Sequence, residues 1–160
     1  MGKKHIWRAM IIFFIFTGAS QVQANEVGKL SEGQTLYVPA YSHIYIGNKA
    51  NPYRLTITLS IRNIDPVHTI TITSVHYYGT KGKLLKQYLD TPISLSSLES
   101  TRYIIKSKED EGGSGANFIV KWSSEKRINP PIVESIMIGT QSGQGISFTS
   151  RGQVIYPTKP

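Results

Sequence analysis

The clearest pattern along the chain is an alternation of apolar and polar residues from position 54 to position 63. Leu55, Ile57, Leu59 and Ile61 fall on one side of an extended chain, with threonine, serine and arginine between them. A strict period of two in β-branched residues predicts a strand with one buried face and one face toward solvent. Burial of the four side chains would contribute at most about 6–12 kcal/mol, so we expect this strand at the centre of an antiparallel sheet.

Shorter stretches of β character, separated by turn residues such as Asn51-Pro52, lie along the rest of the chain. Pro39 favours a sheet edge for the strand that it ends, because proline cannot donate to a ladder. A change of phase at Ser74–Val75 indicates a β-bulge, and Gly82 suits a left-handed residue in a hairpin loop. The remaining strands are expected at 34–38, 44–46, 69–78, 84–89, 101–106, 117–123, 133–139, 145–150 and 152–156, with a crossing segment at 92–98.

Turn signals every ten residues or so are typical of a sandwich or barrel. We therefore predict an all-β fold, an immunoglobulin-like antiparallel β-sandwich of about 7–9 short strands. It would form a single domain over residues 33–157, between a linker at 25–32 and a short tail at 158–160.

The first residues of the chain have the pattern of an export signal. Lys3, Lys4 and Arg8 precede an apolar run from Ala9 to Phe16, and small residues flank position 23. This order predicts a signal peptide over residues 1–24 with cleavage after Ala24. The alternative, a membrane anchor, needs about 20 apolar residues, and the run is shorter. We expect the mature protein to be periplasmic or extracellular and to have no transmembrane segment.

Composition limits the partners and the sources of stability. The chain has no cysteine, so neither a disulfide nor a lipid-modified N-terminal cysteine is available. Three of the charges behind the net +8 lie in the predicted signal peptide, and the other basic residues are scattered. Scattered charge on an exported protein argues against nucleic acid. It suits anionic lipid head groups or polymers, or simple solvation.

The most unusual loop is DEGGSGAN at residues 110–117. Its glycines could form a nest of backbone amides that holds an anion, and its acidic pair would equally suit a hydrated cation. Neither a phosphate-binding loop nor a nucleophile elbow is complete here, so a purely structural loop is the competing interpretation. The candidate ligand-binding residues are Asp110, Gly112, Gly113, Ser114, Gly115 and Asn117.

A second glycine-rich loop, GTQSGQG at residues 139–145, joins two predicted strands. Thr140, Ser142 and the following Arg151 could contribute to a pocket for a carboxylate or a sugar, and a plain strand connection is the alternative. If the fold brings the two loops together, Arg151 would either pair with Asp110 and Glu111 as a structural clasp or meet an anionic ligand. A surface pair of this kind would contribute about 0–1 kcal/mol.

Catalytic and metal-binding patterns are weak. Asp65 and His68 come nearest to a close ligand pair for zinc, but Asp65 is also explained as a turn former before Pro66. A Ser-His-Asp set could be drawn from Ser114, His76 and Asp65, yet spacing alone does not support one. We therefore assign no catalytic residue, no metal and no cofactor.

Three segments resemble a known family. They are TSVHYYGTKGKLLKQYL from Thr73, GGSGANFIVKW at Gly112–Trp122 and PPIVESIMIGTQSGQGISFTSRG at Pro130–Gly152. They are similar to the bacterial domain-of-unknown-function 3124 family, and the resemblance covers the chain from about Gly33 to Ile155. It implies an exported envelope protein with a small β-rich domain, and it implies no catalytic or ligand residues.

Two functions of different class follow. The first is a non-enzymatic interaction module whose sheet edge or loop surface binds another cell-envelope protein or surface component. The second is a small-ligand or ion-binding domain, with or without hydrolytic activity, built on the two glycine-rich loops. The second requires the loops to lie at the same end of the fold, beside a polar pocket.

Overall fold

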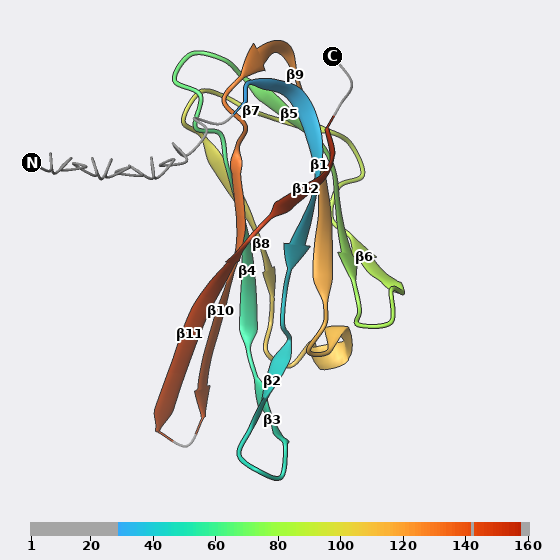
Figure 1. Cartoon of the computed structure of the whole chain (residues 1–160), viewed down its shortest axis with the longest axis vertical. Coiled ribbons are helices and arrows are strands. Elements are labelled where there is room, and N and C mark those ends of the chain that lie inside the picture. The colour runs from blue at the N-terminus through green and yellow to red at the C-terminus, as the bar shows by residue number, and fades with distance from the viewer. Residues whose placement is uncertain (1–28, 142, 158–160) are drawn as a thin grey trace, which may run out of the picture.

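The structure, a computed structural model, describes residues 29–141 and 143–157. The predicted signal peptide, linker residues 25–28 and the tail at 158–160 therefore lie outside the described residues. The strands are β1 (Ser31–Pro39), β2 (His43–Ile46), β3 (Asn51–Arg54), β4 (Thr56–Arg62), β5 (Ile70–Tyr78), β6 (Leu84–Gln87), β7 (Ile93–Leu95), β8 (Ser100–Ile105), β9 (Asn117–Ile128), β10 (Ile132–Gln141), β11 (Gln144–Arg151) and β12 (Gln153–Pro157), and η1 (Asp110–Gly112) is a short 3-10 turn (Figure 1).

The predicted all-β antiparallel fold is confirmed, since every pairing among these strands is antiparallel. The described residues contain twelve strands, more than the 7–9 predicted. Asn51-Pro52 was expected as a turn and residues 93–95 as part of a crossing segment, but residues 51–54 and 93–95 pair as short strands. None of the helices that the described residues contain has the length and apolar character to span a membrane.

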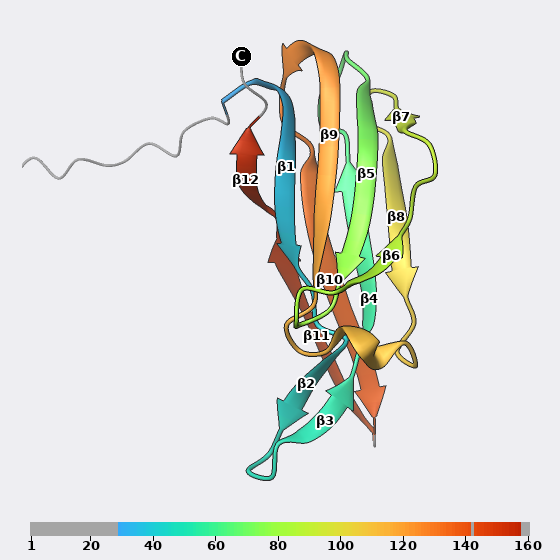
Figure 2. The same ribbon diagram turned by 90° about the vertical axis from the view of Figure 1, so that its right-hand side faces the viewer.

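Two larger sheets lie face to face, with the hydrophobic core between them (Figure 2). The six-stranded sheet has the order β12-β1-β9-β5-β6, and β7 also pairs with β5. The four-stranded sheet has the order β11-β10-β4-β8, and β2 and β3 form a separate ribbon. The ribbon and the β10–β11 hairpin extend past the two layers at the same end, the lower end in Figure 1.

The central strand is confirmed. β4 lies between β10 and β8, and Leu55, Ile57, Leu59 and Ile61 each have 0% exposure. The opposite face of β4 is less exposed to solvent than the alternation predicts. Ser60 is buried there and accepts a hydrogen bond from Nε of Arg62.

The phase change in β5 is a bulge, as predicted. Ile72 pairs with Trp122 and Ser74 with Lys121, so Thr73 is the extra residue between them. The bulge shifts the buried positions from Ile70 and Ile72 to Val75 and Tyr77. Both sides of the irregularity therefore face the same core.

The edge position expected for the first strand is wrong. β1 lies between β12 and β9, and β12 pairs with it only as far as Tyr37. At Pro39 the strand has β9 alone as a neighbour. Proline is tolerated because the neighbouring strand has already ended, not because β1 is an edge strand.

Candidate functional site

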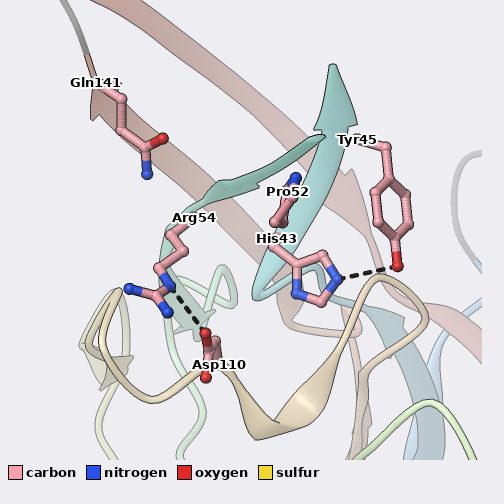
Figure 3. A pocket seen from close by; sticks show the side chains of 6 residues that line it. All are labelled: His43, Tyr45, Pro52, Arg54, Asp110 and Gln141. Atoms are coloured by element: carbon pink, nitrogen blue, oxygen red, sulfur yellow. Dashed lines mark hydrogen bonds and ion pairs between the residues drawn. The ribbon is translucent and has the colours of Figure 1, made fainter. Parts of the chain in front are cut away.

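The two glycine-rich loops lie at the same end of the fold, and a polar pocket opens between them. The β2–β3 ribbon forms one side, and the first and second loops contribute Asp110 and Gln141. The pocket has a volume of about 540 Å³ and is lined by His43, Tyr45, Pro52, Arg54, Asp110 and Gln141 (Figure 3). The geometric condition for a ligand site at these loops is therefore met. We call this hollow the Arg54 pocket.

A buried tyrosine holds the ribbon against the β10–β11 hairpin. Tyr53 is 1% exposed, and its hydroxyl donates to the carbonyl of Gln144 at 2.6 Å and accepts from the backbone N–H of Gln141 at 3.0 Å. Gly139 makes room for the ring, because a Cβ there would lie 2.6 Å from Tyr53 Cε1. Successive residues of a strand face opposite sides, so Tyr53 faces inward while Pro52 and Arg54 line the pocket.

The charged pair of the pocket joins Arg54 and Asp110. Nε of Arg54 lies 2.8 Å from Oδ2 of Asp110, and the two side chains are 58% and 38% exposed. The contact uses Nε alone. It therefore orients the guanidinium and leaves its two terminal amino groups for another oxygen ligand.

The other polar groups come from the ribbon and the hairpin. Nε2 of His43 and the hydroxyl of Tyr45 lie 3.3 Å apart, with the rings edge to face at 5.2 Å. In Figure 3 the side-chain amide of Gln141 extends from the hairpin toward the Arg54 side of the pocket. Arg54, Gln141 and Tyr45 can all donate hydrogen bonds, and Asp110 is the only carboxylate among the lining residues.

The glycine loop itself is held by two hydroxyl side chains. Ser42 Oγ accepts from the N–H of Gly113 at 2.8 Å, and Thr80 Oγ1 accepts from the N–H of Gly115 at 2.9 Å. Thr80 also donates to the carbonyl of Gly112. These bonds occupy amides that an anion nest would need, so the geometry favours a structural role for the glycines. That role is to fix the position of Asp110.

The structure brings only some of the predicted site residues to the Arg54 pocket. Asp110 lines the Arg54 pocket. Gly112, Gly113, Ser114, Gly115 and Asn117 form the loop behind it, and Thr140 is exposed on the hairpin beside Gln141. Ser142 lies outside the described residues.

Arg151 does not join the others. It pairs with Glu134, seven residues from Gln144 along β11, which corresponds to about 23 Å of extended strand. The predicted pair between Arg151 and Asp110 is not formed, because β11 runs away from the pocket, and Arg54 takes this role. The sequence analysis did not identify Arg54, His43 and Tyr45 as site residues, because Asn51-Pro52 indicated a turn and so hid the β2–β3 ribbon.

Asp65 and His68 form a closed turn at another place in the fold. Oδ1 of Asp65 accepts from the backbone N–H groups of Val67 and His68 at 3.0 and 2.9 Å, and lies 3.1 Å from Nδ1 of His68. The hydrogen bonds from the two backbone N–H groups have the largest effect and hold the pKa of Asp65 well below its usual range. The contact with the His68 side chain lowers this pKa further. Across residues 29–141 and 143–157, no three His, Asp or Glu side chains gather as a metal site.

Comparison with known proteins places the chain in a family. The model of the family described as "Protein of unknown function (DUF3124)" matches residues 33–155, and the chain belongs to this family. The resemblance seen in the sequence is thus confirmed. No curated protein matches the chain. Among solved structures it is similar to a Thermotoga maritima protein, "Crystal Structure of Thermotoga maritima 1070", with 11% identity, a TM-score of 0.47, and coverage of 78% of this chain and 97% of that one.

Proposed function

We propose that the protein is an exported, immunoglobulin-like binding module of the bacterial cell envelope. Its Arg54 pocket would hold a carboxylate or a similar oxyanion displayed by another envelope component. The export signal predicted over residues 1–24 supports the compartment. Two facing antiparallel sheets with loops gathered at one end support the immunoglobulin-like class.

The observation that carries the proposal is the geometry of Arg54. A guanidinium held through Nε by Asp110 presents its terminal amino groups in a fixed orientation, and such a fork matches the two oxygens of a carboxylate. The Gln141 amide and the Tyr45 hydroxyl lie in the same lining and supply further donors. The donors of Arg54, Gln141 and Tyr45 together suit an anionic oxygen as the acceptor.

The shape of the pocket favours a group displayed by a larger molecule. Its main charged side chain, Arg54, is more than half exposed, whereas sites for free small ligands bury most of the ligand surface. The pocket is lined by residues of two projections, the β2–β3 ribbon and the β10–β11 hairpin, which extend past the sheets in Figure 1. A protein or polymer could contact both projections while it places one acidic group against Arg54.

Capture from periplasmic extract, with chemical crosslinking, tests this function. The bait proteins would be the wild type, Arg54→Met, which keeps the apolar stem, and Arg151→Met as a control at an exposed arginine outside the pocket. We expect Arg54→Met to lose the captured component and Arg151→Met to retain it. Both variants should remain folded, because the exposed ion pair of Arg54 contributes only about 0–1 kcal/mol and Arg151 is an exposed side chain.

Equal capture by Arg54→Met and the wild type would refute the role of the pocket. A second measurement separates the small-ligand alternative, namely titration with acetate followed through the Arg54 Nε–H signal in NMR. Saturation by free acetate at low millimolar concentration, without any captured macromolecule, would favour a domain that binds small anions.

A further inference from the structure

A second pocket also borders the segment that carries Asp110. It has a volume of about 360 Å³ and opens between the β5–β6 hairpin, the end of β8 and residues 108–112. Its lining consists of Tyr77, Leu85, Lys86, Tyr88, Ile105, Lys108, Glu109, Asp110, Glu111 and Gly112. We call it the Tyr77–Tyr88 pocket.

The inner wall of this pocket is apolar and aromatic. Tyr77 packs on Phe118 with the ring centroids 4.9 Å apart, and Tyr88 packs on Tyr103 at 5.0 Å. Leu85 and Ile105 complete the wall from the two facing sheets. Walls of this kind suit the apolar body of a small molecule.

Two phenolic hydroxyls, buried behind the surface of the wall, have no hydrogen-bond partner among the described residues. Tyr77 is only 4% exposed, and neither its hydroxyl nor that of Tyr88 makes a hydrogen bond to a described residue. Buried polar groups are nearly always hydrogen-bonded in native proteins, so two neighbouring exceptions in one pocket call for an acceptor. Burial, with a contribution from Glu109, raises the pKa of Tyr88 to about 12, and burial likewise raises that of Tyr77. Both groups therefore remain protonated donors at neutral pH.

The charged groups around the pocket balance one another. Two glutamates, Glu109 and Glu111, and two lysines, Lys86 and Lys108, line the pocket, while Asp110 is already paired with Arg54. A balanced rim gives no preference for an anion or a cation. Lys86 lies across the Tyr88 ring, with Nζ 4.7 Å from the centroid. Because Lys86 is exposed and its contact is a weak cation–π interaction, it can move aside to admit a ligand.

We propose that the Tyr77–Tyr88 pocket binds a small uncharged molecule that has an apolar body and one acceptor oxygen. The body packs against Leu85, Ile105 and the tyrosine rings. When the side chains that cover the two buried hydroxyls, Lys86 among them, move aside, the oxygen accepts hydrogen bonds from these hydroxyls. This site is separate from the Arg54 pocket and does not depend on the function proposed for it.

Two probe molecules of similar shape test the proposal. Acetophenone carries a carbonyl oxygen, and ethylbenzene lacks it. We would titrate both by NMR into the wild type, Tyr77→Phe, Tyr88→Phe and the double variant, with Tyr156→Phe as a control at an exposed tyrosine on β12. Phenylalanine keeps each ring, so the pocket wall remains in place.

We expect the wild type and Tyr156→Phe to prefer acetophenone by about 3–10-fold, the range of one or two neutral hydrogen bonds. The double variant should lose the preference while it still binds ethylbenzene. Failure of both probes to shift pocket signals in the wild type would overturn the proposal, and so would a preference that survives in the double variant. If Glu109 accepts from both hydroxyls in solution, the wild type shows no preference, which also refutes it.

Discussion

Replacement of Gly112 by alanine tests the idea that the glycine loop is shaped by its neighbours rather than by a ligand. A Cβ at this position would lie 1.9 Å from the hydroxyl oxygen of Tyr77, 2.7 Å from its Cζ and 3.0 Å from Cβ of Ala116. Gly112 is not among the glycines with positive φ, so its backbone would accept alanine. The neighbouring side chain alone makes the substitution unfavourable.

The magnitude follows from two opposing effects. Glycine to alanine at a compatible backbone position stabilises by about 0.4–1 kcal/mol, whereas overpacking of a close-packed site costs about 1–3 kcal/mol or more. We therefore expect Gly112→Ala to lower the free energy of unfolding by about 1–3 kcal/mol. Gly145→Ala is the control, because no described atom outside its chain neighbours lies within 4 Å of a Cβ there. It should change stability by no more than about 1 kcal/mol.

A double-mutant cycle identifies the cause. Tyr77→Phe removes the 1.9 Å contact and leaves the ring carbon at 2.7 Å, so it should rescue only part of the loss, with a coupling of about 1 kcal/mol. Urea denaturation followed by tryptophan fluorescence would measure all four proteins. If Gly112→Ala costs the same in the wild type and in Tyr77→Phe, or no more than Gly145→Ala, the steric explanation is refuted.

Three further predictions concern the core, the Asp65 turn and export. Leu59→Ala should cost about 2–5 kcal/mol because it leaves a cavity in a fully buried strand, and Thr58→Ala on the opposite face should cost less than about 1 kcal/mol; equal losses in urea melts would contradict this assignment of faces. Because the folded-state pKa of Asp65 is depressed, the stability it provides is present above its ordinary pKa of about 4 and is lost as the pH falls below that value. In urea melts across an acid pH series, the free energy of unfolding should thus fall less steeply for Asp65→Asn than for the wild type. Parallel curves for the two proteins would show that the carboxylate does not contribute. Intact-mass spectrometry of the mature protein should find Asn25 at the N-terminus, and retention of residues 1–24 would disprove the predicted cleavage.

Local periodicity predicted the parts of the fold that depend on neighbouring residues. The alternation around Ile57 and Leu59 identified the central strand, and both side chains are fully buried. The bulge in β5 was visible as a change of phase in the same pattern. Each of these features is set by which side of a strand faces the core, and a few residues suffice to show it.

The site depends on contacts between distant segments, and periodicity does not report them. Arg54 meets Asp110 across 56 positions, and Tyr53 meets Gln144 across 91. Pro52 led to the prediction of a turn where β3 lies. A strand of a two-stranded ribbon has a partner on only one side and therefore tolerates proline. The sequence did show that the two glycine-rich loops are unusual. That Arg151 lies far from the pocket follows from the direction of β11, which the sequence does not show.

The position of β1 has a consequence for the order of folding. β1 pairs with β9 on one side and with β12 on the other, so both of its partners come late in the chain. Such a topology has high contact order, and proteins of this kind fold in milliseconds to seconds rather than microseconds. A chain that emerges from a ribosome or a translocation channel presents β1 long before either partner. The six-stranded sheet therefore assembles only after β9 has emerged. Until then β1 is an unpaired strand, which makes the incomplete chain prone to aggregation.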